Sequence, residues 1–482
     1  MGDRKGFEDR AQDLAVHLLA SKEVLVIGHI DADGITAASI AMSSLKRARI
    51  KSNVRFVKRI DQDEASRINK ERADTVWLVD LGSGYASRLT HPGLCISDHH
   101  APDRPCSDHD HHQARQTTLF DVNLQLNPMD FGFDGSREMS GAGATYFVAK
   151  AMNPHNKDLA SLAVVGALGD FQDNDDGRLI GMNQEIVADG VAAGTLDVKE
   201  DIRLYGRETR PLTRLIQFSD LQLPWTSDWQ KVKDFFWENN VPLGRRDNLR
   251  TWSSLSDMER FRVRDVLMKE LAALGKDTSR LWGEVYLLPR EKVGTELHDA
   301  KEYGTLLNSC GRHDDPELGM GLCIADRKDV AFPELLARVH AKLDDHRKNL
   351  RGGLELLNGA KLERLDSLQY YRTENGYGLP RELETTLGSI LGMALGSGKV
   401  CSDVPLIGFA YTSEGPLKVS ARGTKELVSA GLDLSSAMRQ AAAQVGGAGG
   451  GHNIAAGATI SIGQEMEFLK GLDDIITAQI RR

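Results

Sequence analysis

Asp98, His99 and His100 directly follow the short apolar run of residues 94–96. Placing these side chains beside a buried strand costs several kcal/mol unless something compensates, and a bound metal ion is a frequent compensation. Imidazole and carboxylate groups are also the usual ligands of divalent ions. If this segment is half of a metal site, the other ligands must come from elsewhere in the chain.

Residues of the same types follow other apolar runs. Three such residues follow the run 24–27, and one follows the run 76–79. The apolar stretch 159–168 is predicted to be a buried helix, and another carboxylate stands just beyond its end. Together with His99 these residues make six candidate metal ligands: His29, Asp31, Asp33, Asp80, His99 and Asp170. Two imidazoles and four carboxylates exceed the needs of one ion, but they suit two divalent ions that share a bridging carboxylate.

This ligand set indicates a reaction class. Mixed histidine and aspartate ligation favours manganese or magnesium over metals that prefer thiolates. Two such ions can lower the pKa of a bridging water and hold both the attacking and the leaving oxygens during an in-line displacement at phosphorus. The sequence therefore predicts phosphoester hydrolysis.

The elements that position these residues are predicted from the apolar runs. Runs at 24–27, 54–57, 76–79 and 94–96 are separated by helix-like stretches, which predicts a parallel, doubly wound sheet covered on both faces. In such sheets, ligands collect beyond the carboxyl ends of the strands, where the candidate residues stand. The fold class is α/β, with a doubly wound N-terminal domain at 1–199, a mainly helical unit at 200–330 and a C-terminal α/β domain at 331–482.

Composition bounds the remaining properties. The chain has 482 residues, 41% of them hydrophobic and 27% charged, with a net charge of −9. No apolar stretch approaches the roughly 20 residues that span a bilayer, so we expect a soluble protein without a membrane partner. The first twenty residues lack a secretory signal core and predict an amphipathic helix with Leu14, Val16, Leu18 and Leu19 inward. We therefore expect a cytoplasmic protein.

Two basic groups and the cysteines leave alternatives open. Seven basic and no acidic residues lie between Lys46 and Arg59, and four arginines lie between Arg203 and Arg214. Each group is either a solvated surface or part of a nucleic-acid groove.

The cysteines lack the spacing of zinc or redox motifs and are expected to be buried free thiols: Cys95, Cys106, Cys310, Cys323 and Cys401.

Several motifs, in order along the chain, resemble the DHH phosphoesterase superfamily. They are GHIDADG at 28–34, VDLGSG at 79–84, SDHHAP at 97–102 and GALGDFQD at 166–173. KVSARGT at 418–424 and GGAGGGHNIAAGA at 446–458 are similar to the DHH-associated C-terminal domain. The chain is most similar to archaeal RecJ-like exonucleases of the GINS-associated type through RLYGRETRPL at 203–212, the segment 294–312 and the segment 431–442.

The resemblance implies a nuclease that releases nucleotides from single-stranded DNA, from the 5′ end, with two Mn²⁺ or Mg²⁺ ions and a preference for Mn²⁺. It assigns one ion to His29, Asp31 and Asp80, and the other to Asp33, Asp80, His99 and Asp170. Asp98 would orient His99, and His100 would face the scissile phosphate. The implied substrate grip consists of Ser420, Arg422, Gly450, Gly451, His452 and Asn453.

Other residues carry weaker expectations. The histidines His109, His111 and His112 suit a polar loop better than a second metal site. Asn127 could brace the metal loop or form an ordinary turn. The glycines 446–451 lack the ending of a nucleotide-binding phosphate loop. The tryptophans Trp225, Trp229, Trp237 and Trp252 are expected in helix packing or at a partner interface, with base stacking as the alternative.

Three functions remain open from the sequence. The first is a two-metal exonuclease acting on single-stranded DNA, with RNA as a further substrate. The second is a phosphodiesterase for short oligonucleotides or cyclic dinucleotides, although the large middle unit favours a polymer. The third is a scaffold of the replication machinery with little or no catalysis, which would bind GINS or the replicative helicase complex.

Overall fold

The computed structural model describes residues 2–480, except 104–122, 175–176, 220, 222, 227, 246–247, 277, 279–280, 374–375, 397–399 and 414. The described chain forms two compact units, Met1–His340 and Ala341–Arg482. Their boundary falls within the long helix α12 (Phe332–Gly359). No helix in the described ranges is both long and apolar enough to cross a membrane.

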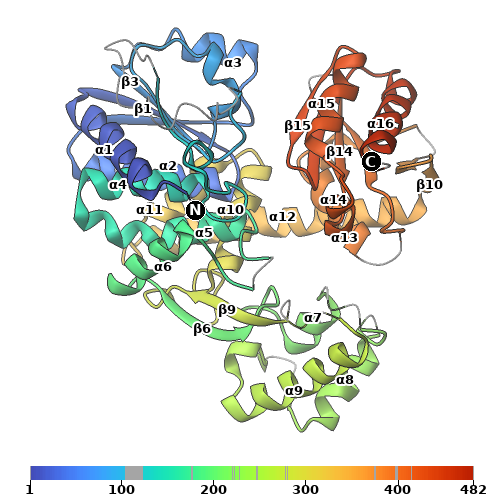
Figure 1. Cartoon of the computed structure of the whole chain (residues 1–482). Helices are drawn as coiled ribbons and strands as arrows, with labels where there is room; N and C mark the ends of the chain where they lie inside the picture. Colours follow the sequence, from blue (N-terminus) through green and yellow to red (C-terminus); the bar gives the residue numbers. More distant parts are fainter. Residues whose placement is uncertain are drawn as a thin grey trace. The chain divides into compact units, whose positions relative to one another are not determined.

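A five-stranded parallel sheet forms the centre of the N-terminal part of the first unit (Figure 1). Its order is β2-β1-β3-β4-β5, with strands β1 (Glu23–His29), β2 (Lys51–Val57), β3 (Thr75–Val79), β4 (Leu94–Ser97) and β5 (Asn123–Leu126). The four predicted apolar runs coincide with β1 to β4, which confirms the α/β fold class. In this strand order the chain direction across the sheet switches between β1 and β3, and a ligand site is expected there.

Two helices connect strands of this sheet, α2 (Ala32–Arg47) and α3 (Gln62–Ile68), and α1 (Arg4–Ala20) precedes β1. Three more follow β5: α4 (Gly141–Met152), α5 (Ala160–Gly169) and α6 (Met182–Ala192). Helix α2 packs against both α4 and α5. Between β3 and β4 the chain forms only the short 3-10 helix Ser83–Arg88, where a helical crossover was expected.

Helix α1 corrects one detail of the sequence analysis. Its buried face consists of Phe7, Ala11, Leu14, Ala15 and Leu18, whereas Val16 and Leu19 are exposed. Residues at helical spacings from Phe7 share one face, and Val16 and Leu19 fall outside it. The prediction for Leu14 and Leu18 is confirmed, and that for Val16 and Leu19 is wrong.

The middle of the chain is mainly helical. The antiparallel strands β6 (Asp197–Ile202) and β9 (Trp282–Leu287) enclose α7 (Leu212–Gln217), α8 (Trp229–Glu238) and α9 (Asp257–Ala273) in sequence. Figure 1 shows these three helices grouped beyond the β6–β9 ribbon. They share a hydrophobic core that includes Phe236, Trp252 and Leu267. A short hairpin, β7 (Gly244–Arg245) and β8 (Asn248–Leu249), lies between α8 and α9.

The first unit ends with α10 (Ala300–Arg312), α11 (Pro316–Ile324) and the start of α12. Helix α10 packs against α5 and α2, so this late segment lies beside two helices of the N-terminal part. Asp299 caps α10 by accepting hydrogen bonds from the backbone N–H groups of Lys301 and Glu302 at 2.9 and 3.1 Å.

The second unit contains a mixed sheet of order β10-β11-β13-β14-β16-β15, with β12 beside β13. Its strands are β10 (Lys361–Arg364), β11 (Gln369–Arg372), β12 (Gly378–Leu379), β13 (Leu406–Tyr411), β14 (Leu417–Arg422), β15 (Ala448–Gly451) and β16 (Ala455–Ile460). Its helices, besides the end of α12, are α13 (Leu387–Gly396), α14 (Lys425–Ser429), α15 (Leu434–Gln444) and α16 (Glu465–Ile480).

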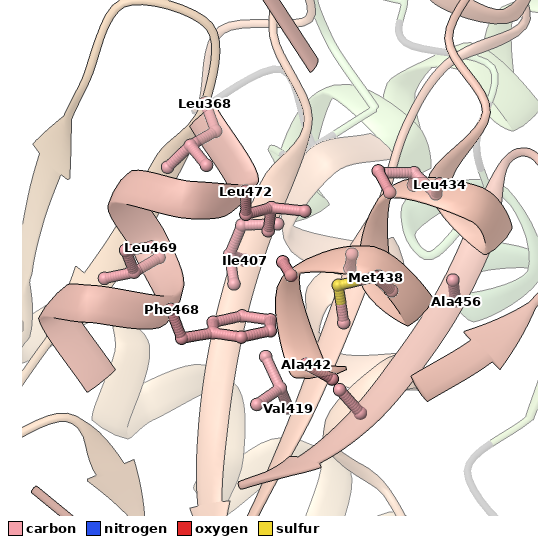
Figure 2. Packing of buried hydrophobic residues seen from close by; sticks show 14 of the residues in the cluster. Leu368, Ile407, Val419, Leu434, Met438, Ala442, Ala456, Phe468, Leu469 and Leu472 are labelled. Carbon is pink, nitrogen blue, oxygen red and sulfur yellow. The ribbon is translucent and has the colours of Figure 1, made fainter. Parts of the chain in front are cut away.

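Two apolar clusters cover opposite faces of this sheet. Figure 2 shows Met438 of α15 and Phe468 of α16 packed near Ile407 and Val419 of the strands. On the other face, Leu391 of α13 belongs to a cluster with Leu406 and Ala410 of β13. Because side chains alternate along a strand and Leu417, Val419 and Ala421 face α15 and α16, Ser420 and Arg422 lie on the α13 face.

Candidate metal centre

The six candidate metal ligands lie together at the carboxyl ends of β1, β3 and β4. His29 is the last residue of β1, Asp80 follows β3 directly, and His99 comes two residues after β4. Asp31 caps α2 and Asp33 lies in its first turn, while Asp170 caps the carboxyl end of α5. The short turn after β1 and the parallel strand order thus bring residues up to 141 positions apart into one site.

Asp80 is at the centre of this site. One of its carboxylate oxygens lies 3.5 Å from Nδ1 of His29, and the other lies 3.3 Å from Nε2 of His99. His29 Nδ1 is 2.9 Å from a carboxylate oxygen of Asp31. On the other side, His99 Nε2 is 3.4 Å from Asp170 and 3.8 Å from Asp33. Asp80 therefore adjoins two groups of donors, one on each side.

The backbone at Asp80 is held in an uncommon conformation. Its φ is +61°, a region that side chains other than glycine rarely adopt. Gly141, the first residue of α4, lies directly against it, since a Cβ atom added at Gly141 would come within 2.4 Å of an Asp80 carboxylate oxygen. The conformation directs a fully buried carboxylate into the space between the two donor groups.

Asp33 is fixed by the amino end of α4. The backbone N–H groups of Gly141 and Ala142 donate to its two carboxylate oxygens at 2.7 and 3.1 Å. These N–H groups belong to the first turn of the helix and have no partner within it, and the helix dipole favours a negative charge at this end. The Asp33 carboxylate is thereby oriented while lone pairs remain available.

Backbone and aspartate contacts orient the two histidines. Nδ1 of His99 lies 2.6 Å from the carbonyl oxygen of Gly135, and because a carbonyl can only accept, this nitrogen carries the proton. Nε2 of His99 then faces the carboxylates, and it can give its lone pair to a metal ion that displaces its proton. The buried carboxylate of Asp98 accepts hydrogen bonds from the N–H of Ser83 and from Nδ1 of His100, both at 2.8 Å.

Asn127 fastens the loop that carries these histidines. Its side-chain amide donates to Oγ of Ser83 and to the carbonyl oxygen of His100, each at 2.8 Å. The interpretation of Asn127 as a brace therefore agrees with the geometry. The contacts from Gly135 and from the N–H groups of α4 had no recognisable signal in the sequence, because a backbone group of any residue can provide them.

The site is electrostatically unfavourable without cations. Burial, followed by the negative charges of Asp80 and Asp170, raises the pKa of Asp33 well above its usual value. The pKa of Asp170 is raised by burial and by its acidic neighbours, although His99 opposes this effect. Burial alone would lower the pKa of His29, but the adjoining carboxylates of Asp31 and Asp80 raise it well above the ordinary value.

The donor set fits divalent metal ions. Within the described residues, neither carboxylate oxygen of Asp80 nor Nε2 of His99 has a hydrogen-bond partner, although all three are buried. Unsatisfied buried polar atoms are rare in proteins and call for a binding partner. Three groups have ligand atoms within 4.8 Å of one another: Asp80 with His99 and His100, His29 with Asp31 and Asp80, and Asp33 with His99 and Asp170. Oxygen-rich ligation of this kind suits Mn²⁺ and Mg²⁺.

Two domain families match the chain outside this site. The DHH-CID domain matches residues 204–282, and the DHHA1 domain matches residues 384–478. The first covers the helical middle and the second covers most of the second unit. These two matches cover less than half of the chain, and they support its placement in the DHH phosphoesterase superfamily. The N-terminal parallel sheet, the helical middle and the C-terminal sheet domain follow one another as in the RecJ fold.

One curated relative and several solved structures resemble this chain over nearly its whole length. An uncharacterized protein of Methanocaldococcus jannaschii is 27% identical over 465 residues, which is 95% of this chain and 94% of the relative. RecJ from Thermus thermophilus, solved with Mn²⁺, has a TM-score of 0.56 at 16% identity over 98% of this chain. This chain spans 55% of that RecJ chain. CDC45 from Entamoeba histolytica has a TM-score of 0.60 at 13% identity, over 98% of this chain and 97% of its own.

The residues expected to hold substrate lie in the second unit. Ser420 and Arg422 are on β14, Gly450 and Gly451 end β15, and the β15–β16 turn carries His452 and Asn453. Register places Ser420 opposite Gly457 of β16, which in turn faces Gly450. The guanidinium of Arg422 approaches α13 so closely that a Cβ atom at Gly388 would lie 2.1 Å from its Nη2. The glycine cluster is thus largely a strand, and it forms no phosphate loop.

The basic groups are largely engaged with other side chains. In the first group, five residues form ion pairs: Arg47 with Asp158, Lys51 with Glu23, Arg55 with Glu64 and Glu71, Lys58 with Asp314, and Arg59 with Asp61. In the second group, Arg203 and Arg207 are buried in ion pairs, while Arg210 and Arg214 lie over aromatic rings. These contacts favour the surface and packing interpretation over a nucleic-acid groove.

The tryptophans of the middle divide into two kinds. Trp252 is fully buried and donates to Asp201 at 2.8 Å, and Trp225 stacks on Phe235 with ring centroids 4.7 Å apart. Trp229 and Trp237 of α8 are 49% and 84% exposed. Trp229 and Trp237 alone therefore remain candidates for contact with a partner among these four.

Two expectations need separate mention. His109, His111, His112 and Cys106 lie outside the described residues. Cys95 and Cys310 are free and buried as expected, and Cys323 is half-buried. Cys401 is exposed, so the expectation of burial is wrong for this residue, which lies in the irregular segment before β13.

We expect Mn²⁺ to raise the melting temperature of the protein and EDTA to reverse the shift, because a ligand that binds only the folded state stabilises it. The effect is about 2.7 kcal/mol when the free ion is at 100 times its dissociation constant. The matched variant is Asp170→Asn, which removes one charge from the repelling cluster. Its metal-free melting temperature should equal or exceed that of the parent, while its Mn²⁺ shift should be smaller. An undiminished Mn²⁺ shift in Asp170→Asn, measured by scanning calorimetry, would contradict this account of the site.

Proposed function

We propose that the protein is a two-metal exonuclease that hydrolyses phosphodiester bonds of single-stranded DNA from the 5′ end, with RNA as a further substrate. The observation that carries this proposal is the buried Asp80 carboxylate, whose two oxygens face separate donor groups. The first group is His29 with Asp31, and the second is Asp33 with His99 and Asp170. An arrangement of this kind suits a pair of ions with one shared ligand.

The site residues have distinct roles in this proposal. Bound Mn²⁺ or Mg²⁺, with Mn²⁺ preferred, would activate a water and neutralise charge on the phosphate oxygens. Asp80 bridges the two donor groups, and Asp98 holds His100 through Nδ1. The His100 side chain is 40% exposed, and we assign its other nitrogen to contact with the scissile phosphate. The N–H groups of α4 hold Asp33 in place throughout.

The substrate grip is assigned to the second unit. Arg422 would donate charge-assisted hydrogen bonds to a strand phosphate, and Ser420 lies on the same face of β14. The backbone N–H groups of Gly450 and Gly451 can approach a phosphate closely, and His452 and Asn453 follow in the turn. The structures of RecJ with Mn²⁺ and Mg²⁺ support a metal-dependent nuclease of this fold.

A scaffold role is the second candidate, and one observation favours it. The TM-score to CDC45 is 0.60, against 0.56 and 0.54 for two RecJ structures, although coverage does not separate them, since the match spans 97% of the CDC45 chain and 95% of one RecJ chain. A scaffold requires no metal ligands, yet all six candidate ligands are present and assembled here. The nuclease proposal accounts for these residues, and a partner surface on the middle helices is compatible with either function. A phosphodiesterase for short oligonucleotides or cyclic dinucleotides would use the same metals and differ in substrate length.

Asp80→Ala should abolish hydrolysis while the fold remains intact, because the shared carboxylate serves both ions. The assay uses 5′- and 3′-labelled single strands of DNA and RNA with Mn²⁺, and the first labelled products report polarity and sugar preference. Circular dichroism and melting in EDTA control for folding. Activity of Asp80→Ala within tenfold of the parent would refute the two-metal assignment, and cleavage confined to dinucleotides would favour the short-substrate enzyme.

Arg422→Ala should cost about 1.5–3 kcal/mol on a long single strand, the usual worth of a hydrogen bond to a charged group. The loss should be much smaller on a chromogenic phosphodiester with one phosphate, which lacks the strand contacts. We would compare kcat/KM for both substrates at saturating Mn²⁺, with Lys470→Ala on the exposed face of α16 as the control. Equal losses on both substrates would place Arg422 at the scissile phosphate, against the proposal.

We also propose that the exposed face of α8 binds a protein of the replication machinery, GINS or the helicase complex. Trp229 and Trp237 stand eight residues apart on α8, with Lys233 between them and its ammonium 4.4 Å from the Trp229 ring centroid. Exposed aromatic residues of this kind often anchor protein interfaces. Replacing both tryptophans with serine should abolish binding to purified GINS while leaving turnover of single-stranded DNA unchanged. A loss of turnover in the folded variant would instead indicate base stacking.

A further inference from the structure

The segments 203–212 and 294–312 contribute no candidate metal ligand, yet they pack against each other, and the second also packs against the loop between β1 and α2. The second segment contains α10, which lies beside α5 and α2. Helix α10 contacts the backbone next to Asp31, Asp33 and Asp170. These contacts indicate a role for α10 in positioning the metal site.

Asn308 of α10 reaches the loop between β1 and α2. Its side-chain oxygen accepts a hydrogen bond from the backbone N–H of Ala32 at 2.9 Å. Ala32 is the first residue of α2, and its N–H has no partner within the helix. It also separates Asp31 from Asp33, which belong to different candidate donor groups. One side chain thus fixes the peptide that joins ligands of both ions.

Two glycines of α10 let the helix lie directly against the backbone of two other segments, the loop before α2 and the end of α5. A Cβ atom at Gly311 would lie 1.6 Å from the carbonyl oxygen of Ile30, so only glycine fits there. Two helical turns earlier on α10, a Cβ atom at Gly304 would lie 3.2 Å from Cα of Gly169, next to Asp170. The helix therefore touches two separate segments that carry candidate ligands.

Buried polar contacts anchor the other end of α10. Asp299 at its cap lies 3.4 Å from the guanidinium of Arg207, and Glu302 accepts a hydrogen bond from the N–H of Glu208 at 2.8 Å. Thr209 donates its hydroxyl proton to the same Glu302 carboxylate. The charged residues of this network are at most 8% exposed, so the helix cannot shift without breaking contacts in a nearly dry interior.

We propose that Asn308 is a positioning residue of the metal centre, which sets the orientation of Asp31 and Asp33 through the Ala32 N–H. The inference rests on the proposed function in taking Asp31 and Asp33 as ligands of two ions. Helix α10, anchored to the segment 203–212 at its start, holds Asn308 in place. Residues that orient metal ligands usually contribute about 10- to 100-fold to metal affinity.

The test measures Mn²⁺ binding to the full chain by titration calorimetry. Asn308→Ala removes the acceptor, Asn308→Leu removes it with similar volume, and Ser309→Ala is the control. Ser309 is buried on the same helix, but its hydroxyl donates to the carbonyl of Leu306 within α10. We expect both Asn308 variants to bind Mn²⁺ about 10- to 100-fold more weakly, with metal-free melting temperatures near that of the parent. Ser309→Ala should bind like the parent.

The two binding steps provide a signature that general destabilisation would not produce. Because Asp31 and Asp33 belong to different donor groups, Asn308→Ala should weaken both steps, whereas Asp170→Asn should weaken one. Parent-like affinity in Asn308→Ala would overturn the proposal, and if Asn308→Leu does not fold, Asn308→Ala decides. If the parent protein binds Mn²⁺ but cleaves no single-stranded DNA, the nuclease function is refuted. The comparison of Mn²⁺ affinities between the parent and the Asn308 variants then still tests the role of Asn308. A parent that binds no Mn²⁺ would overturn both.

Discussion

Four carboxylates and two imidazoles share one small space around Asp80, and the repulsion among the carboxylates, which the imidazoles only partly offset, is the constraint that shapes the first unit. Burial and like charges raise the pKa values of Asp33 and Asp170, so the metal-free cluster resists full ionisation. Bound cations offset this repulsion only if each ligand atom keeps its position. Much of the surrounding backbone serves that purpose.

The supports for the donors come from elements that are distant in sequence. The amino end of α4 holds Asp33, the carbonyl of Gly135 sets the protonated nitrogen of His99, and Asn127 fastens the loop after β4. The left-handed backbone at Asp80 is accommodated because α4 begins with a glycine at the point of contact. Each support uses a hydrogen bond or a close approach that leaves the metal-facing lone pairs available.

The sequence predicted the features that depend on local patterns. Apolar runs located β1 to β4, and the polar residues directly after them were correctly expected at one edge of the sheet. It did not predict β5, whose four residues carry no distinct signal, or the absence of a full helix between β3 and β4. The supports from Gly135 and α4 could not be predicted, because they involve backbone groups brought together only by the tertiary fold. The ion pair that engages Arg47 also depends on a distant carboxylate, that of Asp158.

The repulsion around Asp80 has an evolutionary consequence. Loss of a single carboxylate would weaken metal binding and, in the same step, relieve repulsion in the metal-free protein, so a descendant with an impaired metal site could keep its fold without compensating changes. Likeness of fold alone, such as that to CDC45, therefore says little about whether a chain of this architecture binds metal ions. The complete set of six candidate ligands is more informative about metal binding than the fold is.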